Sequence, residues 1–373
     1  MARSPLMMAL RAGRGAPVER AASPLIGRYS ISLSPMRIPI AFKNTDSPGS
    51  PIVLAADLGG TKTNMALFQH TGSGPQLIRQ AHFPSNDYSS MADIVRKFVA
   101  TDPMPARICV GVAGPIMNGK SKLTNLTWGI DQEALEKDLG VPAVVLINDL
   151  EATAYGLAAL EDKDLLTFPG KDPEPGNLAL IAPGTGLGEA GLYWDGTFYH
   201  PFATEGGHAG FGPREAIDVE LFQYLRNQFE HISWERVTSG QGIVNIFHFL
   251  IDVKGAKPAA SLIEAVKADG AAAISEACMQ GEDPTAKQAL SMFVRYLAIE
   301  SANLMLKVKG TGGVYIGGGI PVAILPLLQS GEWLNDFHKG GRMRPLLESV
   351  TVNIILQSKT ALYGAGWYGM YNM

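Results

Sequence analysis

The 373-residue sequence predicts an α/β fold with two domains, and three observations support this prediction. From Pro51 onward, apolar strand-like runs alternate with amphipathic helical stretches, a pattern typical of a mixed or parallel sheet covered by helices. Two segments, 51–68 and 177–196, share one plan: an apolar run, a glycine-rich turn and a second apolar run. The chain is also long enough for two domains with substantial cores.

The composition excludes several classes of protein. Hydrophobic residues make up 46% and charged residues 18% of the chain, which is typical of a globular protein. The formal net charge of −4 argues against a general nucleic-acid or membrane-surface binder. With only Cys109 and Cys278 present, a cysteine-built zinc site is excluded. No apolar stretch reaches the roughly 18 residues that a membrane span needs.

The first 50 residues differ from the rest of the chain. They carry seven basic residues against two acidic ones, with scattered serines and prolines and no clear periodicity. This composition predicts a disordered leader over 1–50. The expected location of the protein is the cytoplasm, and an organelle is the alternative if the leader is a transit peptide. A start codon read too far upstream would give the same pattern.

The first hairpin has the features of a phosphate site. Asp57 ends its first apolar run, and Gly59 and Gly60 follow. Glycines tolerate positive φ, so we expect backbone N–H groups of this turn to converge on a phosphate. Asp57 is placed to hold a cation, directly or through water. On this segment alone, an ordinary hairpin with a glycine turn is the alternative.

The second hairpin repeats this plan with Gly184, Thr185 and Gly186 in its turn. Two such turns would hold one triphosphate from both sides. Gly186, Gly188 and Gly191 also match the dinucleotide-binding spacing G-x-G-x-x-G. A strand-like run follows where that motif requires a helix, so we predict that the match is false.

A strand between the two hairpins runs directly into Asn148 and Asp149. Other elements expected here are helices at 89–100 and 132–139 and strands at 107–115 and 143–147. Ligands bind at the carboxyl ends of strands in α/β sheets, so Asp149 is placed for chemistry. Asn148 is expected to cap the next helix, with Glu151 as its capping-box partner. The helix N-terminus should then favour the ionised form of Asp149.

A second polar cluster lies in the middle third of the chain. Glu205 and His208 flank two glycines, so a tight turn would direct both side chains at one small polar ligand. A metal half-site is the alternative, although no further ligands follow at metal-site spacing. Glu235, taken alone, is expected to form a surface ion pair with Arg236.

The last third of the chain ends in a glycine-rich region. Its expected elements are peripheral helices over 254–287, a long helix that opens at Asp283 and Pro284 and stops at Gly310, and a final helix weakened by glycines near 363–367. Between the last two helices, a short strand leads into Gly317, Gly318 and Gly319. Backbone must approach something closely there, and a flat base is a candidate.

Six motifs in this order resemble the bacterial-type glucokinases, from about Pro51 to the C-terminus. They are Asp57-Leu-Gly-Gly-Thr-Lys-Thr, Asn148-Asp-Leu-Glu-Ala-Thr-Ala, Pro183-Gly-Thr-Gly-Leu-Gly, Glu205-Gly-Gly-His, Glu235-Arg-Val-Thr-Ser-Gly-Gln-Gly and Gly312-Gly-Val-Tyr-Ile-Gly-Gly-Gly-Ile-Pro. The resemblance implies the two-domain fold shared by sugar kinases, actin and heat-shock ATPases, with an active-site cleft between the domains. We expect a small domain of 51–159 plus 360–373 and a large domain of 160–359.

The resemblance also implies a function, namely ATP-dependent phosphorylation of the glucose 6-hydroxyl, the first step of glycolysis, with Mg²⁺. By the same analogy, Asp149 is the catalytic base and also contacts the sugar, while Asn148, Glu205, His208 and Glu235 bind the other hydroxyl groups. The implied nucleotide contacts are Gly59, Gly60 and Thr61 in one phosphate turn, Gly184, Thr185 and Gly186 in the other, Gly317, Gly318 and Gly319 against adenosine, and Asp57 at Mg²⁺ through water. Lys62 stands where some relatives have asparagine, and it either contacts a phosphate or faces solvent.

Two other functions fit these residues. The first is the same mechanism on another hexose or an amino sugar, because residues of this kind do not exclude a different C2 substituent. The second is a non-catalytic sugar sensor, against which Asp149 and the two phosphate turns argue. The expected partner is a small sugar, with no nucleic acid and no membrane, and family analogy implies a homodimer.

Overall fold

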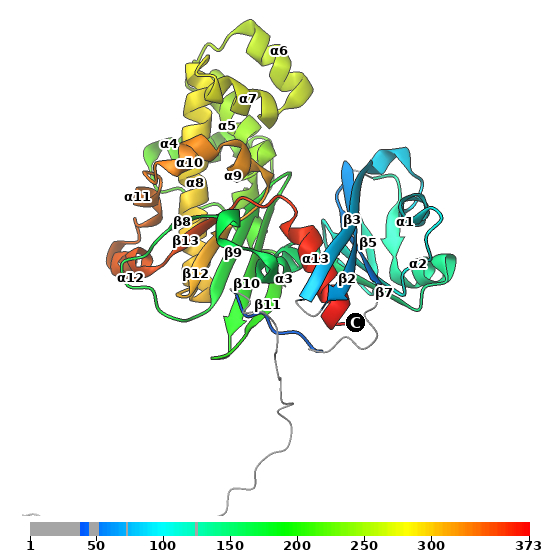
Figure 1. Ribbon diagram of the computed structural model, residues 1–373. Coiled ribbons are helices and arrows are strands. Elements are labelled where there is room, and N and C mark those ends of the chain that lie inside the picture. Colours follow the sequence, from blue (N-terminus) through cyan, green and yellow to red (C-terminus); the bar gives the residue numbers. More distant parts are fainter. Residues whose placement is uncertain (1–37, 45–51, 72–73, 124–125) are drawn as a thin grey trace, which may run out of the picture. The chain divides into compact units, whose positions relative to one another are not determined.

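Two sheets organise the chain in the computed structural model, which describes residues 38–44, 52–71, 74–123 and 126–373 (Figure 1). The first sheet has the strand order β3-β2-β1-β4-β7. Its strands are β1 (Ile52–Leu58), β2 (Lys62–Thr71), β3 (Gly74–Pro84), β4 (Arg107–Val112) and β7 (Ala143–Asn148). β1 is antiparallel to β2 and parallel to β4, which is in turn parallel to β7. The sheet is therefore mixed, as the sequence predicts.

The second sheet has six strands in the order β11-β10-β9-β12-β13-β8. They are β8 (Leu165–Phe168), β9 (Leu178–Pro183), β10 (Leu187–Trp194), β11 (Tyr199–Thr204), β12 (Gly313–Ile316) and β13 (Val352–Ile355). β9 and β10 form the predicted second hairpin. Because β10 is a strand, the G-x-G-x-x-G spacing does not open a helix and the predicted false match is confirmed. A separate small sheet pairs β5 (Lys120–Lys122) with β6 (Gly129–Asp131).

The helices divide the apolar core into three clusters. The helices are α1 (Met91–Val99), α2 (Gln132–Leu139), α3 (Asp149–Gly156), α4 (Ala216–Arg226), α5 (Gly240–Asp252), α6 (Ala260–Asp269), α7 (Ala271–Met279), α8 (Pro284–Val308), α9 (Gly319–Ala323), α10 (Leu325–Gln329), α11 (Leu334–Phe337), α12 (Arg344–Ser349) and α13 (Thr360–Tyr371). α1 and α2 pack on one face of the first sheet, while α5 and α8 pack on one face of the second (Figure 1). The third cluster joins residues of both sheets to α3 and α13.

Capping residues define the starts of two helices that the sequence predicts, α1 and α8. The Ser90 hydroxyl accepts a hydrogen bond from Asp93 N at 3.2 Å and opens α1. Asp283 Oδ1 accepts from the backbone N of Thr285 at 2.8 Å and of Ala286 at 3.0 Å, and α8 follows with proline in its first turn. These side chains satisfy N–H groups that a helix leaves without partners.

The glycines of α13 allow a close helix contact. The sequence suggests that they weaken this helix, and the structure shows what they permit. A Cβ on Gly364 would collide with the carbonyl oxygen of Ala152 in α3, and a Cβ on Gly156 would collide with that of Thr360. The helix that begins at Asp149 is therefore held directly against the C-terminal helix.

The prediction of a disordered leader over 1–50 is wrong for residues 38–44. Backbone hydrogen bonds of 2.8 Å join Pro39 and Ala41 to Tyr199 of β11. Phe42 is buried, and its ring centroid lies 5.2 Å from that of Tyr371 in α13. Isoleucines and a phenylalanine at alternate positions supply the apolar surface that the basic composition of the leader obscured. The rest of the predicted leader, 1–37 and 45–50, lies outside the described residues.

Two further sequence predictions concern cysteines and membrane spans. Cys109 and Cys278 are both free and buried. Within the ranges that the structure describes, no helix combines the length and the apolar character needed to cross a bilayer.

Candidate active site

A pocket of about 410 Å³ opens where β7 passes into α3. Its lining comes from β7, α3, β11 and the loop after β4: Pro115, Ile116, Leu146, Ile147, Asn148, Glu151, Ala203, Thr204 and Glu205. Two of the predicted site residues, Asn148 and Glu205, thus face the same pocket from different sheets. Glu151 also lines it, although the sequence suggests only a capping role for that residue.

Asn148 caps α3, as predicted. Its Oδ1 accepts hydrogen bonds from the backbone N of Leu150 at 2.9 Å and of Glu151 at 3.3 Å. The oxygen is therefore used within the protein, and the amide nitrogen Nδ2 is the part of the side chain available to a ligand. Burial raises the pKa of the Glu151 carboxyl group, and a hydrogen bond from the Asn148 backbone lowers it.

Asp149 is the first residue of α3, and the expectation that it is readily ionised is wrong. Burial, followed by the negative charge of Asp57, raises the pKa of Asp149 to about 7, and Glu205 adds to this. A hydrogen bond from Leu150 N to Asp149 Oδ1 at 2.9 Å acts in the opposite direction. Desolvation and two neighbouring carboxylates outweigh the helix terminus. The charges of Asp57 and Glu205 thus both act on Asp149.

Asp57 stands at the end of β1 and pairs with Asn64 across the β1–β2 hairpin. Asn64 Nδ2 donates a hydrogen bond to Asp57 Oδ2 at 3.1 Å. Burial raises the pKa of Asp57, although this bond and the charge of Lys62 lower it. Asp57 is thus a half-buried carboxylate with one amide partner and a second carboxylate, Asp149, nearby.

Hydrogen bonds from Ser85 hold the turn after Asp57 in place. Ser85 Oγ donates to the carbonyl oxygen of Gly59 at 2.8 Å, and Ser85 N donates to that of Thr61 at 2.9 Å. Neither Gly59 nor Gly60 has positive φ, so the turn does not use the backbone freedom that glycine allows. The carbonyl groups of the turn are held by Ser85, and Thr61 and Lys62 are exposed.

The turn of the second hairpin is linked to Glu235. Gly184 N donates to the carbonyl oxygen of Gly186 at 2.8 Å, which closes the turn. Leu187 N donates to Glu235 Oε2 at 3.0 Å, and the same oxygen lies beneath Gly186. The predicted ion pair of Glu235 with Arg236 is wrong, because the Arg236 guanidinium lies 4.0 Å from the centre of the Phe229 ring instead.

Glu205, His208 and Glu235 meet because two loops are joined by backbone bonds. Trp234 N donates to the carbonyl oxygen of Ala209 at 3.0 Å, which draws the second loop against the first. His208 Nε2 then lies 3.8 Å from Glu205 Oε2, and His208 Nδ1 lies 3.9 Å from Glu235 Oε1. Glu205 and His208 are 68% and 60% exposed, whereas Glu235 is 25% exposed. This arrangement presents two carboxylates and an imidazole to solvent at one place.

The three glycines after β12 lie beside the second turn. Gly317 N donates to the carbonyl oxygen of Ile181 at 2.8 Å, which extends the pairing of β12 with β9. Gly318 has a φ of 86°, and a Cβ there would collide with the carbonyl oxygen of Pro183. Its close neighbour in the structure is therefore strand β9. Nothing lies within 4 Å of a Cβ built on Gly319, so that position borders open space.

Together, the fold and these polar groups define the class of the protein as an ATP-dependent sugar kinase with the actin-like ATPase fold. The family model described as Glucokinase matches residues 54–371. The chain belongs to the glucokinase family, and its activity is ATP-dependent phosphorylation of glucose.

Individual relatives support this assignment over nearly their whole length. The chain is 40% identical to the glucokinase of Nostoc punctiforme, in an alignment that covers 84% of this chain and 97% of the relative. It is 35% identical to the glucokinase of Synechocystis, with 84% and 96% covered. Among solved structures, a glucokinase from an Antarctic psychrotroph matches with a TM-score of 0.72 and 29% identity, over 86% of this chain and 98% of that one.

Proposed function

We propose that Asp149 is the base of the glucose kinase reaction. Its carboxylate accepts the proton of the glucose 6-hydroxyl, the hydroxyl oxygen bonds to the γ-phosphorus of ATP, and the bond to the bridging oxygen of ADP breaks. The observation that carries this role is the raised pKa of Asp149, about 7, beside the pocket. A base with a pKa near the working pH is well matched to proton transfer.

Four further side chains are proposed to bind the sugar. Asn148 offers Nδ2 as a donor, and Glu205, Glu235 and His208 offer groups that pair with hydroxyls. Glucose presents many donors and acceptors at once, so a site of this kind rejects an analogue that leaves one of these groups unpaired.

The two glycine turns are proposed to hold the phosphates of ATP, and Gly317, Gly318 and Gly319 to lie near the adenosine. Gly59, Gly60 and Thr61 form the first phosphate turn in this proposal, and Gly184, Thr185 and Gly186 form the second. Support comes from the free space beside Gly184 and Gly319, where no atom lies within 4 Å of a Cβ position. Phosphate oxygens approach backbone N–H groups most closely where no side chain intervenes.

The residues around Asp57 fit a magnesium ion bound through water. Asp57 and Asp149 are neighbouring carboxylates whose negative charges repel, which a cation would relieve. Among the described residues, no group of three or more His, Cys, Asp or Glu side chains is arranged to hold a metal by itself. Magnesium commonly uses one or two carboxylates together with waters and substrate phosphates. When bound, it supplies charge neutralisation at the phosphates.

Motion of two lobes is part of the proposal. The small lobe comprises 51–159 plus 360–373, and the large lobe comprises 160–359. Pocket residues come from both segments, so sugar binding would draw the lobes together and exclude water. Small-angle scattering with and without glucose tests this, and an unchanged radius of gyration would contradict it.

An ADP-release assay tests the proposed roles. The protein receives MgATP and, separately, glucose, mannose, fructose, glucosamine or N-acetylglucosamine, and Asp149→Ala is assayed in parallel. We expect glucose-dependent turnover that falls by about 10²-fold or more in the variant. Turnover with another sugar and not with glucose would keep the proposed mechanism but change the substrate. Binding of glucose without any turnover in folded protein would contradict the proposal and favour a sensor.

A further inference from the structure

Glu189 is a buried acid that the proposed reaction does not use. It lies on β10 and is 1% exposed. Among the described residues, neither of its carboxylate oxygens has a hydrogen-bond partner from an N–H or O–H donor. An ionised carboxylate in such a place would lose its hydration without compensation, which is very costly.

The group that faces Glu189 is a second carboxyl group, that of Glu300 in α8, which is fully buried. Both Glu300 oxygens accept hydrogen bonds, from Lys307 Nζ at 2.8 Å and from Asn303 Nδ2 at 2.7 Å. Burial raises the pKa of Glu300 as well, but its hydrogen bonds with Lys307 and Asn303 lower it, so we assign the negative charge of the pair to Glu300. Glu189 then carries the proton and donates it in a hydrogen bond to Glu300. Burial, and then the charge of Glu300, raise the pKa of Glu189 to about 8.

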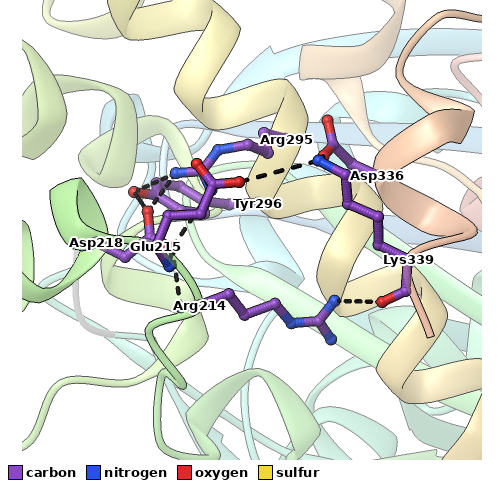
Figure 2. A network of polar contacts seen from close by, with 7 residues as sticks. All are labelled: Arg214, Glu215, Asp218, Arg295, Tyr296, Asp336 and Lys339. Atoms are coloured by element: carbon purple, nitrogen blue, oxygen red, sulfur yellow. Dashed lines mark hydrogen bonds and ion pairs between the residues drawn. The ribbon is translucent and has the colours of Figure 1, made fainter. Parts of the chain in front are cut away.

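A nearby polar network contains a buried carboxylate that stays ionised because it is paired with a cation (Figure 2). Asp218, also 1% exposed, forms an ion pair with Arg295 and accepts a hydrogen bond from the Tyr296 hydroxyl at 2.9 Å. This network reaches the acid pair, because Arg214 Nη2 donates to Asn303 Oδ1 at 2.9 Å. Glu189 has no cation of this kind in direct contact among the described residues, which is consistent with a neutral carboxyl group.

The side chain of Glu189 lies directly under the Glu205–His208 turn. A Cβ on Gly206 would collide with Glu189 Oε2. The backbone of Glu189 is also linked to this turn through Thr204. Thr204 Oγ1 donates to the carbonyl oxygen of Glu189 at 2.9 Å, and Gly206 N donates to Thr204 Oγ1 at 3.1 Å. A displacement of the Glu189 carboxyl group would therefore displace the turn that carries both proposed sugar ligands.

We propose that Glu189 and Glu300 share one proton, and that this pair positions the Glu205–His208 turn for glucose. Glu189 is a positioning residue in this account, since it acts through Gly206 and does not touch the substrate. The inference rests on the proposed sugar-binding roles of Glu205 and His208. In addition, the affinity for sugar depends on the protonation state of the Glu189–Glu300 pair.

Loss of the shared proton at alkaline pH leaves two negative charges facing each other. The described charged groups around the pair are Lys307, which is 48% exposed, and Arg214, which reaches Glu300 only through Asn303. Glu205 and His208 lie on the turn that packs over Glu189. Because the folded protein holds the proton more tightly than the unfolded chain, the stabilisation is lost as pH rises through about 8. We expect the KM for glucose to rise over this range, while kcat, which depends on Asp149 in α3, changes less.

The variant Glu189→Gln tests this account. Glutamine has the same shape, donates an N–H to Glu300 and cannot ionise. In wild type we expect the KM for glucose to rise by about three- to tenfold between about pH 7 and about pH 9.5, which is the effect of one hydrogen bond of ordinary strength. In Glu189→Gln the KM should stay near its neutral-pH value throughout. The matched control is Glu264→Gln, an exposed acid paired with Lys267, which should keep the wild-type profile.

Three results overturn the inference: no alkaline rise in wild type, the same rise in Glu189→Gln, or a loss of kcat without a change in KM. Glu205→Gln separates this inference from the proposed function, because an unchanged KM for glucose in that variant removes the sugar-binding role itself. If Glu189→Gln does not fold, infrared spectra of Asp149→Asn decide the question. A carboxylic acid band present at about pH 7 must disappear by about pH 9.5, and its absence at the lower pH contradicts a shared proton.

Discussion

At the scale of single residues, Glu235 joins two parts of the proposed site. One carboxylate oxygen accepts a hydrogen bond from Leu187 N, just after the second glycine turn. The other lies 3.9 Å from His208 Nδ1. A single side chain thus contacts the turn proposed for phosphate and the cluster proposed for sugar. It is also the least exposed of the three polar residues in that cluster.

Replacing Glu235 should therefore affect both substrates. We expect Glu235→Gln to raise the KM for glucose and the KM for ATP by about tenfold each, since the hydrogen bond to Leu187 N weakens when the charge is lost. Glu205→Gln, which lacks a bond to that turn, should raise only the KM for glucose. Steady-state kinetics with each substrate varied in turn measures this, and an unchanged KM for ATP in Glu235→Gln would refute the link.

At the scale of elements, α3 is held in place by its contact with α13. The contact depends on Gly364, where the two helices approach too closely for a side chain. α3 begins with Asp149, so its position also fixes the proposed base relative to the pocket.

The variant Gly364→Ala should therefore lower the free energy of unfolding by about 2 to 3 kcal/mol, the usual cost of overpacking a tight contact. Gly212→Ala is the matched control, because no atom lies within 4 Å of the Cβ that it adds. That control should change stability by less than about 0.5 kcal/mol. Urea unfolding measures both variants, and equal stability of the two would show that the helix contact tolerates a methyl group.

At the scale of the whole molecule, residues 38–44 connect elements that are distant in sequence. Ile40 forms a bridge with Tyr199 of β11, and Asn44 N donates to the carbonyl oxygen of Tyr371 at 2.9 Å. Between them, Phe42 packs against the rings of Tyr155, Trp367 and Tyr371. The segment precedes the residues matched by the family model and still belongs to the apolar core.

Truncation of this segment's central side chain should destabilise the protein. We expect Phe42→Ala to lower the free energy of unfolding by about 3 kcal/mol, as for other buried aromatic residues. Lys43→Ala is the neighbouring control, because Lys43 is exposed and its contact with Asn372 uses the backbone N. Thermal unfolding compares the two, and equal melting temperatures would show that the segment adds no stability.

Local patterns were sufficient to predict much of this fold. The alternating apolar runs predict the two hairpins, and Asp283 marks a helix start that the structure confirms. The protonation of Asp149 depends instead on burial and on Asp57, which is 92 positions away in sequence, so no local pattern reports it. The same holds for Glu189 and Glu300, which become neighbours only when β10 packs near α8. The roles of the predicted sugar and nucleotide residues remain predictions.

The central claim is that Asp149 is the base, and the pH dependence of kcat/KM for glucose tests it most directly. A base must be ionised to accept a proton, so activity should rise with pH through about 7, the pKa of Asp149 in the free protein. Asp149→Asn, which keeps the shape and cannot accept the proton, should lose about 10²-fold or more in kcat/KM and lose this rise. Wild-type kcat/KM and an unchanged pH profile in Asp149→Asn would contradict the account.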